Sequence, residues 1–142
     1  MKKLLLFALL VSLSVSGSTS TITFEEIIGK WKSYEPSPDT RTKIGELIAG
    51  ISLHKMELEV SRNAIVNFSR QYENKRVEII AGEKMRQLEE LFVVDLPRVK
   101  GGRYKLVVSG WSEGGNKLLV GHFFLFNKKG LYNGWPVAFE PK

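Results

Sequence analysis

The alternation of apolar and polar residues along successive short segments is the feature that most constrains this chain. From Ser52 to Val60 apolar and polar side chains alternate, and the same period recurs from Ala64 to Tyr72 and from Val77 to Ala81. A period of two is that of a half-buried β-strand, because successive side chains of a strand point to opposite faces. The turns between these segments are short, so we expect neighbouring strands to be antiparallel.

The C-terminal third adds three further segments of this kind. Arg103 to Trp111, Lys117 to Phe126 and Leu131 to Phe139 are separated by turns that contain glycine and asparagine. The segment from Lys117 to Phe126 is apolar on both faces, so we expect it to be covered on both sides. Asn133-Gly134 indicates a turn or bulge in the last segment, and Pro136 indicates an edge position.

The stretch from Gly82 to Pro97 supports two interpretations. Met85, Leu88 and Leu91 have helical spacing among strong helix formers, whereas residues 92–96 have the composition of a strand. Helix and strand both stay open for residues 83–92.

Residues 1–18 have the composition of a signal peptide. Lys2 and Lys3 precede an apolar run from Leu4 to Val11, and small residues follow up to Ser20. The apolar run is shorter than the roughly 20 residues of a spanning helix, so we expect no transmembrane segment in the mature form. We therefore predict an exported protein, periplasmic or extracellular, with a single domain over residues 19–142.

The chain contains no cysteine. Small exported domains often depend on disulfides, so here the hydrophobic core must hold the fold alone. Without its first 18 residues the chain has about 120 residues, the usual size of one domain and enough to bury such a core.

The predicted domain begins with a short helix. Thr23 can cap this helix, Glu26 can bond back to the cap, and Gly29 can end it. A first strand follows over residues 31–34, and residues 39–51 indicate a loop with a helical turn or two. The whole pattern predicts an all-β fold, an antiparallel barrel of seven to eight strands with a short N-terminal helix; a two-layer β-sandwich is the alternative.

The segment Phe24-x-x-Ile27-Ile28-Gly29-x-Trp31 resembles the opening of the lipocalin and fatty-acid-binding protein superfamily. In that superfamily a short helix closes one end of a barrel and a Gly-x-Trp begins the first strand. The resemblance implies a lipocalin-like barrel with a cavity for an apolar ligand.

Catalytic and cofactor motifs are missing from the sequence. It has no cysteine nucleophile, nucleophile elbow, phosphate loop or zinc-protease motif, so we predict a protein that is not an enzyme and has no cofactor or metal. His54 and His122 lie on separate predicted strands, and we interpret them as partly buried histidines of a sheet. Lysines and arginines are dispersed among glutamates, and loss of Lys2 and Lys3 lowers the formal charge from +6 to +4. We expect no nucleic-acid partner.

Arg70 and Tyr72 are the strongest candidates for ligand contact. They share the strand face that carries Phe68, and a guanidinium beside a phenol can hold a carboxylate. In fatty-acid-binding proteins an Arg-x-Tyr of this kind binds the ligand carboxylate, on a strand near the C-terminus. Trp31 and His122 complete the predicted ligand-binding set. The alternative is that Arg70 and Tyr72 lie near water at the end of their strand.

Aromatic residues gather near the glycine-rich turns of the C-terminal third. Trp111, Tyr132 and Trp135 can form a platform for a sugar or a protein partner, or can cap the ends of a small β core. We therefore expect a binding protein for a small apolar or amphipathic ligand in a barrel cavity. The alternative is a protein- or glycan-binding module, such as an inhibitor of a secreted hydrolase, that acts through these aromatic loops.

Overall fold

The computed structural model describes residues 20–34, 55–98, 101–113 and 115–142. The predicted signal peptide, the predicted loop at 39–51 and His54 lie outside the described residues. In the part of the chain that is described, no helix has the length and apolar character needed to cross a membrane.

The N-terminal helix is present where the sequence places it. Strand β1 (Ser20–Thr21) precedes helix α2 (Phe24–Ile27), which leads into strand β2 (Gly29–Ser33). The carboxylate of Glu26 accepts a hydrogen bond of 3.3 Å from the backbone N–H of Thr23, as the capping pattern predicts. The indole of Trp31 donates a 2.8 Å bond to the carbonyl of Ile27, which ties the helix to the first strand of the barrel.

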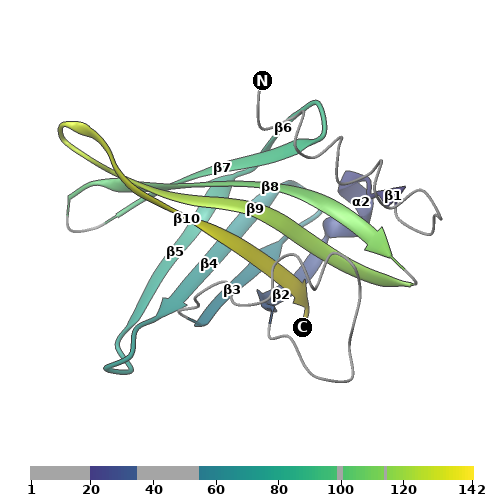
Figure 1. The fold of residues 1–142 in the computed structure, drawn as a ribbon, viewed down its shortest axis with the longest axis horizontal. Coiled ribbons are helices and arrows are strands. Elements are labelled where there is room, and N and C mark those ends of the chain that lie inside the picture. The colour runs from purple at the N-terminus through teal and green to yellow at the C-terminus, as the bar shows by residue number, and fades with distance from the viewer. Residues whose placement is uncertain (1–19, 35–54, 99–100, 114) are drawn as a thin grey trace.

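The remaining chain forms an antiparallel, nearly closed barrel (Figure 1), which confirms the predicted fold class. The sheet order is β5-β4-β3-β2-β10-β9-β8-β7-β6, and β1 pairs with β8, so the strand count is slightly above the predicted seven to eight. The strands are β3 (Lys55–Val60), β4 (Ile65–Gln71), β5 (Val77–Lys84), β6 (Arg86–Leu88), β7 (Leu91–Pro97), β8 (Arg103–Glu113), β9 (Asn116–Asn127) and β10 (Gly130–Pro141).

The ambiguous stretch from Gly82 to Pro97 contains strands and no helix: the end of β5, all of β6 and β7, and the turn between the last two. Its helical spacing does not correspond to a buried stripe, because Met85 is buried while Leu88 is 53% exposed. Leu88 pairs with Leu91 at the tight turn between β6 and β7. Pairing with neighbouring strands therefore overrides the helix propensity of this stretch.

Barrel closure depends on β5 and β6, which only Met85 separates in the chain. β5 pairs with β4 at one edge of the sheet, and β6 pairs with β7 at the other. β5 also lies beside β7, but among the described residues no backbone ladder joins these two strands. We call this gap between β5 and β7 the seam.

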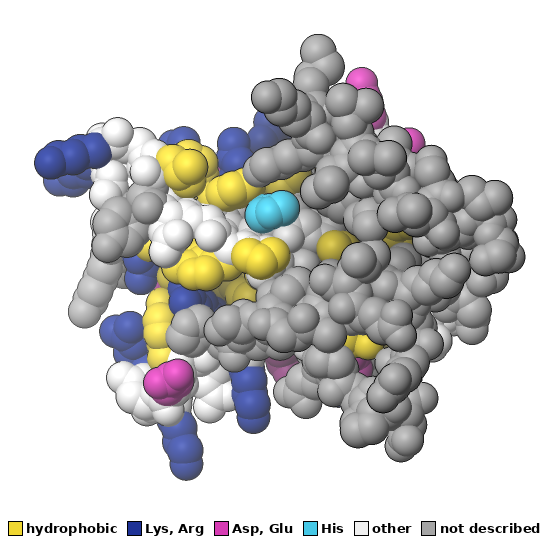
Figure 2. Space-filling model, in the orientation of Figure 1, with side chains coloured by type: hydrophobic (Ala, Val, Ile, Leu, Met, Phe, Trp, Pro, Cys, Tyr) yellow, Lys and Arg dark blue, Asp and Glu magenta, His cyan; other side chains and the backbone are white. Residues whose placement is uncertain are grey.

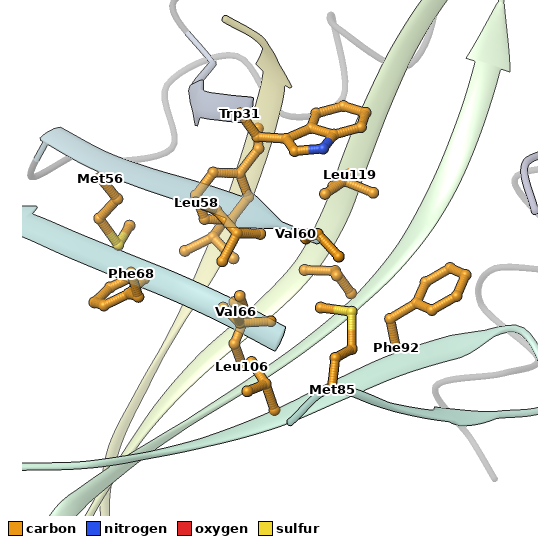
Figure 3. Close-up of a cluster of buried hydrophobic side chains, with 14 of the residues drawn as sticks. Trp31, Met56, Leu58, Val60, Val66, Phe68, Met85, Phe92, Leu106 and Leu119 are labelled. Atoms are coloured by element: carbon orange, nitrogen blue, oxygen red, sulfur yellow. The ribbon is translucent and has the colours of Figure 1, made fainter. Parts of the chain in front are cut away.

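The interior of the barrel is packed with side chains (Figure 3). Val66 and Phe68, on the face that the sequence directs inward, are 0% and 1% exposed. A void large enough for water would leave part of its lining accessible, so these side chains do not border one. The core at this level is a dense packing of aliphatic and aromatic groups.

A second, smaller cluster covers part of the outer face of the wall. It contains four buried side chains, Tyr34, Trp111, Leu118 and Ala138. The prediction that residues 117–126 are covered on both sides is therefore confirmed for Leu118, whereas His122 and Phe124 on the same outer face are only partly buried. A register shift between Leu131 and Asn133 confirms the predicted bulge in β10.

We expect Leu106→Ala to lower the free energy of unfolding by about 2–5 kcal/mol, because Leu106 is fully buried and its removal leaves a cavity in the core. Leu88→Ala is the matched control: this leucine is 53% exposed, so the change should stay within about 0.5 kcal/mol. Urea unfolding of both variants measures the difference. Equal effects would contradict the described core.

Candidate functional site

The main group of polar side chains inside the barrel lies at the seam. Strand alternation directs Arg70 of β4 and Glu78 of β5 inward, and the chain places Tyr72 just after β4 and Arg98 just after β7. Tyr104 of β8 completes the group. We call these five residues the seam cluster.

Glu78 is the common acceptor of the seam cluster. Its carboxylate accepts hydrogen bonds from the hydroxyl of Tyr104 at 2.6 Å, the hydroxyl of Tyr72 at 2.8 Å and Nε of Arg98 at 3.0 Å. The bond to Arg98 joins β5 to the end of β7, where the backbone forms no ladder. Side chains therefore bridge the gap that the backbone leaves open.

The same contacts fix the protonation states at neutral pH. Burial alone would raise the pKa of Glu78, but the hydrogen bonds from Tyr104, Arg98 and Tyr72 outweigh it and lower the pKa below its ordinary value. Burial, and then the bond to Glu78, raise the pKa of the Tyr104 hydroxyl well above its ordinary value. Glu78 is thus ionised and Tyr104 neutral, and the charges of Glu78 and Arg98 cancel.

Arg70 is the cation of the seam cluster that forms no ion pair within the described residues, although Glu78 lies opposite it on the neighbouring strand. Its side chain is 7% exposed, and Nη1 donates a 3.2 Å bond to the hydroxyl of Tyr104. Nε has no hydrogen-bond partner. A buried guanidinium without an ion pair of its own is costly, because the nearby carboxylate of Glu78 is already bonded to Arg98 and offsets the desolvation of Arg70 only in part.

Aromatic rings surround the guanidinium of Arg70. Its central carbon lies 4.7 Å from the ring centroid of Tyr72, 5.6 Å from Trp135 and 5.8 Å from both Tyr104 and Phe123. Such contacts offset only part of the cost of burying the cation, by about 0.5–2 kcal/mol for a well-placed ring. They leave the net positive charge and the free Nε donor in place, which suits an anionic group.

Three of the five predicted ligand-binding residues come together in the structure. Arg70 and Tyr72 are in contact, and Phe68 stacks on Phe123 with 5.5 Å between ring centroids, beside the same site. Trp31 is buried inside the barrel, where it holds the end of α2.

His122 lies on the other side of the barrel wall. Its ring stacks on Phe124 at 5.8 Å, on the outer face, whereas the neighbouring Phe123 belongs to the core. Alternation along β9 therefore separates His122 from Arg70.

The three aromatic residues predicted to bind a partner do not form a common platform in the described residues. Trp111 belongs to β8, is 4% exposed and donates a 2.9 Å bond to Oγ of Ser109 in the outer cluster. Trp135 packs against the core and is partly buried. The side chain of Tyr132 lies outside the described residues.

Sequence reasoning missed Glu78, Arg98 and Tyr104. The sequence aligned Val77, Ile79 and Ala81 on one face of their strand, and in the structure Val77 and Ile79 are 51% and 68% exposed, so that Glu78 faces inward. The β4–β5 ladder has a register shift after this region, between Ala81 and Glu83 on β5. The signal in the sequence was Glu78 itself, a charged residue on the face opposite to Val77 and Ile79, which could have been matched with Arg70 on the preceding strand.

Comparison with protein-family models, curated proteins and solved structures gave no match. Among the described side chains, no group of three His, Cys, Asp or Glu is arranged to hold a metal ion.

We expect Glu78→Gln to destabilise the protein at neutral pH by about 2 kcal/mol, because three hydrogen bonds to a carboxylate are weakened. The pKa of Glu78 is lowered in the folded state, so its contribution is complete above its ordinary value of 4.5 and is lost as the pH falls through the folded-state pKa. The stability difference between wild type and variant should therefore shrink on acidification.

Urea unfolding between pH 7 and pH 3 measures this difference, with Glu73→Gln as the control. Glu73 lies exposed in the turn next to the cluster, so its replacement should change stability little at any pH. A difference for Glu78→Gln that stays constant with pH would contradict the assigned ionisation.

Proposed function

We propose that this protein is an exported, non-enzymatic binding protein for a small amphipathic molecule, and that Arg70 binds the anionic group of this ligand. The observation that carries the proposal is Arg70 itself, a buried cation with a free Nε donor and no ion pair among the described residues, in a cluster of two arginines and one carboxylate. A carboxylate, sulfate or phosphate supplies both the missing charge and the missing acceptor.

The packed core limits how far such a ligand can enter. The side chains below Arg70, such as Val66 and Phe68, leave no accessible space, so the apolar part of the ligand remains close to the end of the barrel. There Trp135 and Tyr72 are partly exposed and contact Arg70, and they are the side chains that must move to admit the ligand. Their rings supply the apolar contact surface.

The net charge of the seam cluster favours an anionic ligand over a cationic or a neutral polar one. The carboxylate of Glu78 is already paired with Arg98 and bonded to two tyrosines, so it is not available to a cationic ligand. The remaining charge is that of Arg70. Ligands with one anionic group and a short apolar part therefore fit the site best.

We expect Arg70→Met to lower affinity for an amphipathic carboxylate by about tenfold to a hundredfold, because a charge-assisted hydrogen bond is lost. The same variant should be more stable than wild type, because a buried charge is replaced by an apolar side chain of similar length. Quenching of tryptophan fluorescence measures binding, since Trp135 lies beside Arg70, and urea unfolding measures stability.

The titration compares a series of carboxylates of increasing chain length with the alcohols of the same length. Arg103→Met is the matched control, because Arg103 is an exposed arginine near the same end of the barrel. Loss of carboxylate binding in Arg70→Met only, with alcohols unaffected, is the expected result. Equal affinities for the carboxylates in wild type and Arg70→Met would reject the proposal.

A further inference from the structure

We propose that the end of the barrel next to Arg70 docks on an anionic phospholipid surface. We call this region the basic end, and define it by the three turns that follow β4, β7 and β9: residues 72–76, 98 with 101–102, and 128–129. The inference rests on charge and exposure at these turns, and it goes beyond ligand binding by Arg70.

The topology brings these three turns together. Antiparallel strands place every second turn at the same end of a barrel, and Figure 1 shows the β4–β5, β7–β8 and β9–β10 hairpins extending from one end, opposite α2. Contacts between the hairpins agree with this view: Arg98 bonds to Glu78, and Arg103 lies 5.1 Å from the ring centroid of Phe126. A depression of about 390 Å³ lies between the second and third hairpins.

Positive charge dominates the basic end. Together with the adjoining strand residues, over 70–78, 98, 101–104 and 126–131, it contains seven lysines and arginines but two carboxylates, Glu73 and Glu78. Figure 2 shows dark blue side chains gathered at this end of the molecule. Five of these cations are exposed and form no ion pair within the described part of the chain: Lys75, Arg76, Arg103, Lys128 and Lys129.

Two of the hairpins carry an exposed aliphatic residue directly beside their basic pair. Val77, 51% exposed, follows Lys75 and Arg76, and Leu131, 62% exposed, follows Lys128, Lys129 and Gly130. Exposed aliphatic groups gain nothing from contact with a charged polymer such as a nucleic acid or an acidic glycan. An anionic lipid surface can bind both kinds of side chain: its phosphates attract the cations, and the aliphatic groups enter the boundary between headgroups and acyl chains.

The opposite end of the barrel has a different charge character, which favours one orientation. Exposed carboxylates on α2 and on the turn between β6 and β7 offset the cations of this end, and one of them pairs with Lys117: Glu25, Glu26, Glu89 and Glu90. A negative surface potential attracts the basic end and repels these carboxylates. The docked molecule therefore presents Arg70 and Trp135 toward the membrane.

Co-sedimentation with phosphatidylcholine vesicles that contain about one third phosphatidylglycerol, an anionic phospholipid, tests the proposal. The purified protein should bind these vesicles at low salt, bind pure phosphatidylcholine vesicles at least about tenfold more weakly, and dissociate as salt is raised. Lys128→Glu with Lys129→Glu should weaken binding by about tenfold or more.

Arg62→Glu with Lys84→Glu is the matched control. It makes the same change in net charge with exposed residues away from the basic end, so it should retain most of the binding. Equal losses in the two double variants would overturn the proposal, because net charge alone would then explain the binding. Binding of wild type to pure phosphatidylcholine as tight as to the anionic vesicles would overturn it as well.

Two further variants separate the lipid surface from other anions. Val77→Ser with Leu131→Ser should weaken binding to vesicles but not to heparin. Equal binding of wild type and this variant to vesicles would reject the lipid surface in favour of a soluble polyanion.

Arg70→Met should keep vesicle binding, because Arg70 is buried. If the wild-type protein does not bind the anionic vesicles but still binds a carboxylate ligand through Arg70, docking is refuted and the proposed function stands.

Discussion

The hydrogen bonds to Glu78 are the interaction on which the rest of this barrel depends. A sheet closes without side-chain help only where backbone ladders continue around it, and between β5 and β7 the described residues form no ladder. The carboxylate of Glu78 bridges this seam to Arg98 at 3.0 Å and to Tyr104 at 2.6 Å. These bonds also fix the position of the Tyr104 hydroxyl, which accepts a hydrogen bond from the guanidinium of Arg70. Closure of the barrel and placement of the candidate binding residue therefore have a common origin.

Whereas the hydrogen bonds to Glu78 stabilise the barrel, the burial of Arg70 destabilises it. The packing of Val66, Phe68 and Phe123 would be satisfied by an apolar side chain at this position, and nothing in the closure of the seam requires a guanidinium. Burial of an incompletely bonded cation lowers stability, and such features concentrate where a protein binds or reacts with something. This contrast between Glu78, fully bonded, and Arg70, with a free Nε, separates the structural part of the cluster from the part that is open to a ligand.

The sequence predicted most of the fold but only part of the site. Period-two alternation placed Leu58 and Phe68 correctly in the core, because each of their strands has one apolar and one polar face. The same reasoning failed for His122, since β9 is apolar on both faces and alternation cannot then tell inside from outside. Arg70 and Tyr72 were found because they are two residues apart on one strand. Glu78, Arg98 and Tyr104 were not, because they join that pair only through strand pairing and barrel closure, which a local pattern does not encode.

The position of Arg76 connects the two proposals. Its guanidinium lies 4.5 Å from the ring centroid of Tyr72, and the guanidinium of Arg70 lies 4.7 Å from the same centroid. One phenol ring thus contacts a buried cation and an exposed cation. The two charges are at most about 9 Å apart, so they repel each other over a distance comparable to the screening length of about 8 Å at physiological salt. An anion that moves past Tyr72 toward Arg70 reduces this repulsion and also neutralises the charge of Arg70. A membrane phosphate near Arg76 acts in the same direction, so docking of the basic end lowers the electrostatic cost of moving Tyr72 away from Arg70.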